Sequence, residues 1–159
     1  MEVQSIDLPS QDTAEFLGVP GAITPPFAHP MREALEAQQL SSNNLFFTHG
    51  DAQAFLLKNG DKVIGRITAS FDRNLKQDEG EVVGHMGYFD CIDDPQAAKL
   101  LLDAAESWLK ERQCTMVHGP MDFSIYANYR VQTLGFDTIP FPGEPRNPAY
   151  YPTLLSSAG

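Results

Sequence analysis

Residues 81–113 read EVVGHMGYFDCIDDPQAAKLLLDAAESWLKERQ, and this stretch decides the fold. Its first eleven residues combine β-branched and aromatic side chains, which favour a strand. From residue 95 onward, apolar side chains recur at the three- and four-residue spacing of a helix that packs one face on a core. These side chains are Ala97, Leu100, Leu101, Ala104, Ala105, Trp108 and Leu109. The sequence therefore predicts a strand over residues 81–91 joined to a helix over residues 95–113.

The junction between this strand and this helix is the acidic turn Asp93-Asp94-Pro95. Asp94 is a typical N-cap residue, and proline suits the first helical position. Free amides at a helix start can hold a phosphate, but two like charges about 4 Å apart repel by roughly 4 kcal/mol at an effective dielectric of 20. The turn therefore favours a capped helix over a phosphate site.

The segments on either side of residues 81–113 predict more of the same sheet. Residues 52–58 and 62–72 have strand character and flank the hairpin turn Asn59-Gly60-Asp61. With residues 81–91 they form a meander of three antiparallel strands. Residues 115–118 form a short strand after the helix, and a helical crossover makes that strand parallel to its predecessor.

The two ends of the chain carry weaker patterns within what we interpret as one domain over residues 1–159. Residues 1–30 contain five prolines, which predicts an irregular segment strapped to the body, and residues 30–39 predict a short helix. Beyond the strand at 115–118 we expect a helix over 124–133, a strand over 135–139 and a helical turn over 150–156.

Composition and charge exclude several classes of function. The chain has 159 residues, a net charge of -10 and a pI near 4.6. Such an acidic surface repels nucleic acid and anionic lipid. No apolar run reaches the ~20 residues of a membrane helix, and the first residues lack the features of a signal peptide. We therefore expect a cytoplasmic protein that binds neither nucleic acid nor membrane.

Motifs for other chemistries are absent or weak. The chain has no Gly-x-Ser-x-Gly, no Gly-x-Gly-x-x-Gly and no Walker loop. Cys91 and Cys114 fall at opposite ends of the predicted sheet, which favours two buried free thiols over a disulfide. Four scattered histidines without metal-ligand spacing predict no metal site.

Several short motifs occur in the order found in one family. They are GRI at 65–67, GYFD at 87–90, DDP at 93–95, VHGPMDFS at 117–124, GFD at 135–137 and NPAYYP at 147–152. With the order of predicted elements, they make the chain resemble the GNAT superfamily of N-acyltransferases. These motifs are similar to those in the amino-terminal lobe of bacterial GNAT-like proteins, which often have two lobes. The resemblance implies a mixed α/β (α+β) fold: a mostly antiparallel sheet, splayed near its long strand, with helices on both faces.

The resemblance also implies a cofactor, acetyl-CoA or another acyl-CoA, and an amine or other small-molecule acceptor. The cofactor arm would lie against Tyr88, Phe89, Cys91 and Ile92, and its pyrophosphate near Ala97 and Ala98. GNAT enzymes usually carry a Gln/Arg-x-x-Gly-x-Gly/Ala turn at that helix start. The corresponding residues 93–99 here contain no glycine and no arginine.

Candidate catalytic residues follow from the same comparison and from side-chain chemistry. His85 is a candidate base, since an unperturbed histidine titrates near pH 6.5. Its alternative role is that of a hydrogen-bonded, partly buried side chain, and the same holds for His118. The family's usual acid position holds Val131, so Tyr126 and Tyr129 are the candidate acids. Asp122 and Tyr126 could face a crevice at the end of the strand at 115–118.

Two functional hypotheses remain open on the sequence. One is an acyl-CoA-dependent N-acyltransferase with a degenerate pyrophosphate loop and an unknown acceptor. The other is a non-catalytic GNAT-like module that binds a ligand or dimerises. A second copy of the chain would replace the second lobe of two-lobed relatives, which favours a homodimer.

Overall fold

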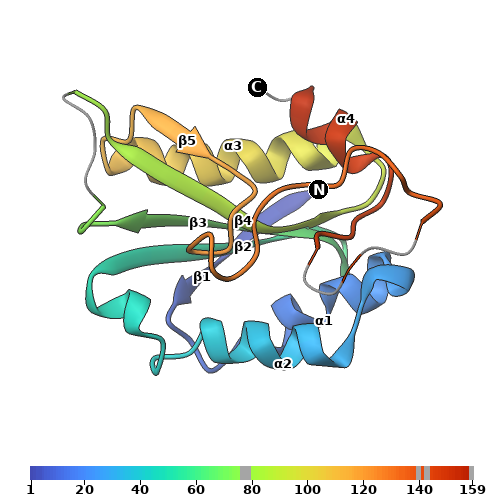
Figure 1. Cartoon of the computed structure of the whole chain (residues 1–159), viewed down its shortest axis with the longest axis horizontal. Coiled ribbons are helices and arrows are strands. Elements are labelled where there is room, and N and C mark those ends of the chain that lie inside the picture. Colours follow the sequence, from blue (N-terminus) through green and yellow to red (C-terminus); the bar gives the residue numbers. More distant parts are fainter. Residues whose placement is uncertain (76–79, 139–140, 142–143, 158–159) are drawn as a thin grey trace.

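A mixed sheet with helices on both faces forms the framework of the protein (Figure 1). The computed structural model describes residues 1–75, 80–138, 141 and 144–157, and in this part the sheet has five strands in the order β1-β2-β3-β4-β5. The elements in chain order are β1 (Glu2–Leu8), α1 (Ala14–Ile23), η1 (Pro25–Phe27), α2 (Pro30–Gln39), η2 (Leu45–Thr48), β2 (Gly50–Asn59), β3 (Lys62–Asp72), β4 (Val83–Cys91), α3 (Pro95–Glu111), β5 (Met116–His118) and α4 (Tyr151–Ser156).

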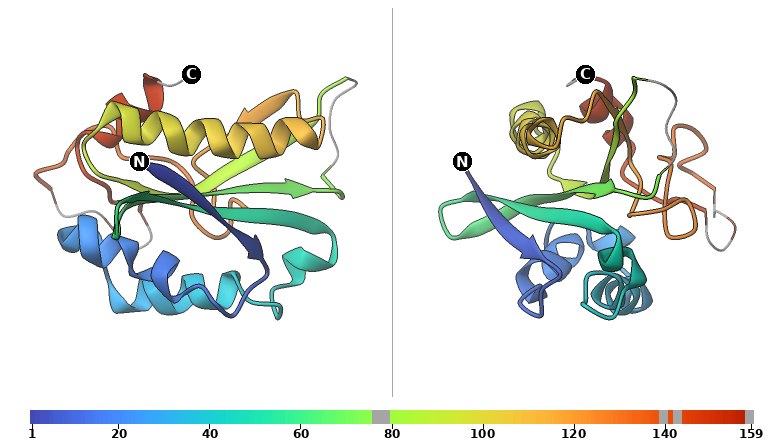
Figure 2. Two further views of the ribbon diagram at one scale, coloured as in Figure 1. Left: turned by 180° about the vertical axis from the view of Figure 1, so that it is seen from behind. Right: turned by 90° about the vertical axis from the view of Figure 1, so that its left-hand side faces the viewer.

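The sheet has the mixed, mostly antiparallel topology that the sequence predicts. Strands β1 to β4 pair antiparallel with their neighbours, and β5 pairs parallel with β4. Helices α3 and α4 lie on one face of the sheet, and α1 and α2 cover the other, as both views of Figure 2 show. Each face therefore has its own hydrophobic core.

The central elements begin and end close to their predicted positions. Strand β3 has the predicted bounds, and α3 ends two residues before the predicted Gln113. The predicted cap is confirmed, because Asp94 Oδ1 accepts hydrogen bonds from the amides of Gln96 at 2.8 Å and Ala97 at 3.4 Å. Burial of the apolar stripe of α3 against β3 and β4 then fixes the helix on the sheet.

The prediction of an irregular segment over residues 1–30 is wrong. Strand β1 is an edge strand, where only one side needs backbone partners, and α1 has its proline in the last turn. Pro20 has no amide hydrogen to donate to the carbonyl of Phe16, four residues earlier. That carbonyl instead accepts a hydrogen bond from Arg66 Nη1 at 3.1 Å. A tertiary partner thus compensates for the proline.

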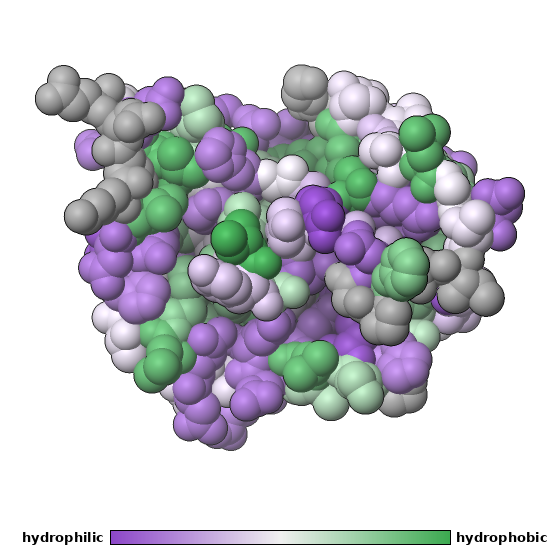
Figure 3. Space-filling view, viewed as in Figure 1, coloured by the Kyte–Doolittle hydropathy of each residue, from purple (hydrophilic) through white to green (hydrophobic). Residues whose placement is uncertain are grey.

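The segment that follows β5 also differs from its prediction. Residues 124–133 form turns instead of a helix, with positive φ angles at Phe123 and Arg130 and a bridge between Met121 and Tyr129. Residues 135–138 form no strand, and residue 139 lies outside the described residues. The segment leaves large apolar side chains exposed, and Figure 3 shows hydrophobic groups standing among hydrophilic ones on this face. These side chains include Ile125, Tyr126, Leu134 and Phe141.

Two further expectations concern the cysteines and membrane-spanning helices. Cys91 is buried and Cys114 is half-buried, and both are free thiols. Burial raises the pKa of the Cys91 thiol to about 12, with Asp94 and Asp90 adding to the effect. Within the described residues, every helix is too short or too polar to cross a bilayer.

Candidate functional site

Strand β4 separates from β5 after three residues and leaves most of its outer edge without a strand neighbour. Only Val83, Gly84 and His85 pair with β5, although β4 continues to Cys91. The register with β3 shifts between Arg66 and Thr68, and opposite this shift Tyr88 has a φ of 50°. This is a β-bulge, which bends a strand and re-aims its side chains. The predicted splay of the sheet is therefore present.

Residues 119–122 fill the gap that this splay opens. The amide of Met121 donates to the carbonyl of Met86 at 2.7 Å, and the amide of Tyr88 donates to Asp122 Oδ1 at 2.5 Å. The approach requires glycine on both sides, because a Cβ on Gly87 would overlap the Met121 carbonyl and a Cβ on Gly119 would crowd the Met86 carbonyl. The chain itself thus occupies the backbone groups at the bulge.

Two tyrosines of the C-terminal segment occupy the next backbone groups along β4. The hydroxyl of Tyr151 accepts a hydrogen bond from the Cys91 amide at 3.1 Å, and the Tyr150 hydroxyl donates to the Cys91 carbonyl at 2.9 Å. Burial and the nearby carboxylate of Asp90 raise the pKa of Tyr151, so its hydroxyl stays protonated. The ring of Tyr151 also packs edge-on against Phe89, with centroids 5.2 Å apart.

The backbone amides at the start of α3 are also occupied by partners within the chain. The side chain of Asp94 accepts hydrogen bonds from the amides of Gln96 and Ala97, and its backbone carbonyl accepts one from the amide of Ala98 at 3.0 Å. The side chains of Ala97 and Ala98 are fully buried against the sheet. The sequence-predicted cofactor residues do lie together at the junction of β4 and α3. The amides of five of them, Tyr88, Cys91, Ile92, Ala97 and Ala98, already have partners within the chain.

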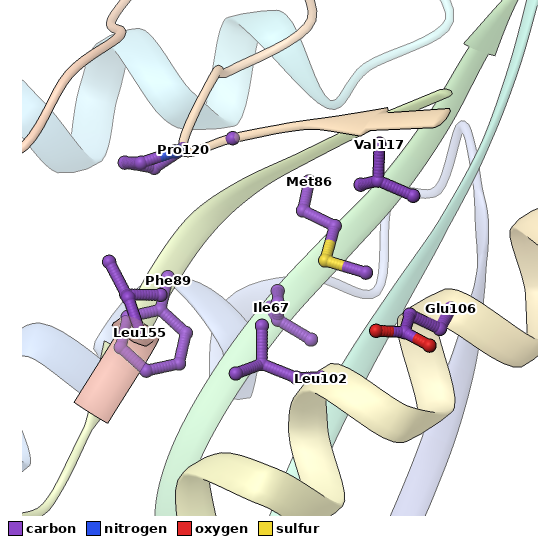
Figure 4. A pocket seen from close by; sticks show the side chains of 9 residues that line it. Ile67, Met86, Phe89, Leu102, Glu106, Val117, Pro120 and Leu155 are labelled. Carbon is purple, nitrogen blue, oxygen red and sulfur yellow. The ribbon is translucent and has the colours of Figure 1, made fainter. Parts of the chain in front are cut away.

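An apolar pocket of about 210 Å³ lies on the α3 face of the sheet. Figure 4 shows side chains from the strands facing those of α3, with Pro120 and Leu155 at one side. Its lining is Ile67, Met86, Phe89, Leu102, Glu106, Val117, Gly119, Pro120 and Leu155. Glu106 is the one charged member of this lining, and it pairs with Lys110 on the surface of α3 at 2.8 Å. The pocket suits a hydrocarbon group far better than a phosphate.

A buried ionic network lies on the opposite face, beneath α1 and α2. Arg66 is fully buried and contacts Glu36 at 2.7 Å and Asp90 at 2.7 Å, and Arg32 bonds to both carboxylates. Burial alone would lower the pKa of Arg66, but Asp90 and Glu36 raise it above its usual value. Two cations and two anions balance each other, and the network connects α2 with β3 and β4. A lone arginine inside the apolar run of residues 63–71 is the sequence signal for it.

Three buried polar atoms on this same face have no hydrogen-bond partner. They are Thr68 Oγ1, Ser70 Oγ and His85 Nδ1, and the three residues are 1%, 1% and 6% exposed. Ser70 and His85 are directly paired across β3 and β4. An unsatisfied buried polar group costs about 1–3 kcal/mol. Nothing in the sequence distinguishes these hydroxyls from ordinary strand residues, so sequence reasoning missed them.

The three sequence-predicted catalytic residues do not come together. His85 lies in β4 on the α1/α2 face, where burial and the neighbouring His118 lower its pKa. Tyr126 is 93% exposed, and Tyr129 is at the surface beneath the guanidinium of Arg130. No hydrogen bond or ring contact within the described residues joins either tyrosine to His85. Their catalytic roles stay predictions.

The predicted crevice residue Asp122 is instead enclosed. Its carboxylate accepts from the Tyr88 amide and from Asn128 Nδ2 at 3.2 Å. Burial raises the pKa of Asp122 to about 6, although these hydrogen bonds oppose the rise. In the described part of the chain, no set of three or more His, Cys, Asp and Glu side chains is arranged to hold a metal ion.

This arrangement of the sheet defines a class of protein: the chain has the GNAT acyltransferase fold. Solved structures share it, including AAC(6')-Iy in complex with the bisubstrate analogue CoA-S-monomethyl-acetylneamine, at 12% identity and a TM-score of 0.52 over 76% of this chain and 80% of that one. A proposed acetyl transferase from Pyrococcus furiosus matches at 15% identity and a TM-score of 0.50 over 89% of this chain and 99% of that one. At such identities the likeness shows the fold alone.

Two curated proteins are similar in sequence, and both are much longer. Protein YghO of Escherichia coli K12 is 31% identical over 154 residues, which are 96% of this chain and 40% of that protein. Bacterial ceramide synthase of Caulobacter vibrioides is 38% identical over 108 residues, 67% of this chain and 28% of that protein. The chain thus spans well under half the length of either relative. No protein-family model matches it.

Proposed function

We propose that this chain is the acyl-chain-binding lobe of an N-acyltransferase, with the acyl chain held in the pocket between the sheet and α3. The apolar lining of that pocket carries the proposal. The relative named bacterial ceramide synthase supports it, because a ceramide is the amide of a fatty acid and an amino alcohol. Burying each methylene of such a chain contributes about 0.8 kcal/mol.

An acyl-CoA would be the natural acyl donor, but its pyrophosphate does not fit the start of α3. Asp94 has already taken the first free amides there, and Asp93 and Asp94 repel a dianion. On the edge of β4, the Met86 carbonyl, the Tyr88 amide and both backbone groups of Cys91 are already bonded within the chain, so a pantetheine arm would have to displace these partners. The role proposed for this lobe is therefore to hold the acyl chain alone.

A non-catalytic ligand-binding or dimerising module is the second candidate function. The occupied edge of β4 favours it, because acyl transfer at this edge would require residues 119–122 and 150–151 to move. Hydrocarbon binding distinguishes the acyl-binding lobe from a module that only dimerises. A module that acts only through its surface has no need of the pocket.

Calorimetric titration separates these functions. We expect decanoate and decanoyl-CoA to bind with similar affinity, and acetyl-CoA to give no heat at millimolar concentration. Leu102→Trp should fill the pocket and abolish both interactions, and Leu155→Phe is a milder second variant on α4. Leu100→Trp is the matched control on α3, since Leu100 does not line the pocket.

Two results would count against the proposal in different ways. If decanoate fails to bind the folded protein, the acyl-binding role is wrong and the surface module remains. If acetyl-CoA binds as tightly as decanoyl-CoA, the nucleotide end is recognised after all. In that case Asp93→Gly with Asp94→Gly should increase the affinity, provided that charge repulsion at the turn limits it.

The homodimer expected from the sequence stays a proposal. The exposed Ile125, Tyr126, Leu134 and Phe141 after β5 support it, because such side chains gain from being covered. Light scattering across a hundredfold range of concentration tests it, and a constant monomer mass would exclude it under those conditions.

A further inference from the structure

A second pocket, of about 180 Å³, lies between α1 and α2. These helices cover the face of the sheet opposite α3, so the sheet separates this α1/α2 pocket from the pocket under α3 (Figure 2). Helix α1 contributes apolar residues to the lining, among them Leu17 and Pro20, and α2 contributes the charged side chains of Arg32, Glu33 and Glu36. The α1/α2 pocket therefore combines an apolar wall with charges of both signs.

Arg32 and His29 supply hydrogen-bond donors to this pocket. The Nε of Arg32 donates to Glu36 at 2.7 Å and its Nη2 donates to Asp90 at 2.8 Å, which holds the guanidinium in place. Within the described residues its Nη1 donates to no acceptor, and the side chain is partly exposed. His29 caps α2, because its Nδ1 accepts from the Met31 amide at 3.1 Å, so the neutral ring carries its proton on Nε2. A guanidinium fixed in this way is pre-organised to bind a carboxylate.

Glu33 adds a carboxylate to the same pocket. It is exposed, and within the part of the chain that the structure describes it forms no ion pair. Glu36, in contrast, is neutralised by Arg32 and Arg66. The buried ionic network is neutral overall, so Glu33 leaves the pocket with an excess of one negative charge. A simple anion is therefore disfavoured, whereas a ligand that carries both an ammonium and a carboxylate finds a partner for each.

Two glycines of α1 leave the space of the pocket open. Gly18 and Gly21 both line it, and residues three apart share one face of a helix. A glycine inside a helix costs roughly 0.5–1 kcal/mol relative to alanine. Neither glycine has a positive φ, and a Cβ at either position would meet nothing within 4 Å. Backbone geometry and packing therefore do not require these glycines, whereas a ligand would use the space beside them.

We propose that the α1/α2 pocket binds a free α-amino acid with an apolar side chain. Arg32 and His29 bind its carboxylate, and Glu33 binds its ammonium group. Leu17 and Pro20 contact its side chain. Because the sheet lies between the two pockets, this inference does not rest on the proposed acyl-binding role.

Calorimetric titration with L-leucine tests the site. We expect saturable binding, and about tenfold weaker binding of 4-methylpentanoate and of 3-methylbutylamine, because each lacks one of the two charged groups. Gly18→Leu and Gly21→Leu should fill the pocket and abolish binding, while the Tm stays the same or rises because leucine favours a helix more than glycine does. Glu33→Gln should weaken L-leucine about tenfold without weakening 4-methylpentanoate. Ala22→Leu is the matched control, since Ala22 is exposed on α1 and does not line the pocket.

Three results would overturn the inference. The first is no heat from L-leucine at millimolar concentration with the folded protein. The second is equal affinity in the wild type, Gly18→Leu and Gly21→Leu, which would place any binding elsewhere. The third is equal affinity for L-leucine and 4-methylpentanoate, because the ammonium group would then have no partner. These variants should leave decanoate binding unchanged, so the inference and the proposed function fail independently.

Discussion

Replacement of Arg66 by methionine tests whether the buried ionic network holds the two layers of the molecule together. The Arg66 guanidinium donates to Asp90 Oδ2 at 2.8 Å, to Glu36 Oε2 at 2.7 Å and to the Phe16 carbonyl at 3.1 Å. Methionine keeps much of the volume but removes every donor. Glu36 and Asp90 would then share the single cation of Arg32.

The structure gives a magnitude for this loss. Breaking a buried ion pair by removing one partner costs about 3–5 kcal/mol, because a buried charge is left uncompensated. A domain of this size loses about 2–4 °C of Tm per kcal/mol, so the Tm should fall by roughly 6–20 °C. Arg73→Met is the matched control, since its pair with Asp51 is about half exposed and contributes less than about 1 kcal/mol.

Urea unfolding followed by circular dichroism at pH 7 and pH 4.5 measures the effect. Burial alone raises the pKa of Glu36, but Arg66 and Arg32 lower it below its usual value overall. Without Arg66 this carboxyl protonates at higher pH, so the deficit of the variant should shrink as the pH falls. A loss below about 1 kcal/mol at pH 7 would refute the reasoning, and so would a deficit that is the same at both pH values.

Three further predictions concern the groups that close the edge of β4 and the start of α3. The folded-state pKa of Asp122, about 6, lies above its unfolded value of about 3.9. Ionisation of this group therefore lowers the unfolding free energy by about 3 kcal/mol in total as the pH rises from 4 to 6. In urea titrations across this pH range, Asp122→Asn should lack that pH dependence. Asp94→Ala should lose about 1 kcal/mol of unfolding free energy through the missing cap, whereas Asp93→Ala should change it by less than half as much. Tyr151→Phe should lower the unfolding free energy by about 1–3 kcal/mol and speed amide hydrogen exchange at Cys91, and unchanged exchange there would contradict the assigned hydrogen bond.

The sequence predicts the elements whose patterns are strong and local. The hairpin of β2 and β3 follows from its turn residues, and α3 follows from a continuous apolar stripe with a cap at Asp94. Their partners are close in the chain, so little tertiary information is needed. The parallel pairing of β5 follows from the length of the crossover through α3.

The errors arise where a distant partner decides the conformation. Pro20 argues against a helix, yet α1 persists because Arg66, 46 positions later, takes the carbonyl that the proline leaves unbonded. After β5, Asn128 bonds to Asp122 and the chain turns back on itself, so local helix propensity is overridden. The candidate site shows the same limit, because the predicted residues at β4 and α3 are adjacent but their partners come from residues 119–122 and 150–151.

The arrangement around β4 also constrains any acyl transfer at this edge of the sheet. The apolar pocket under α3 includes Gly119 and Pro120 in its lining, so it lies beside the gap where β4 leaves β5. Asp122 and its neighbours fill that gap, and Asp122 is bonded to the amide at the bulge. Acyl transfer at this edge would therefore require residues 119–122 to leave β4, whereas binding of a hydrocarbon chain in the pocket would not. If decanoate binds while Asp122 stays bonded to Tyr88, the pocket recognises a hydrocarbon chain without any transfer at this edge.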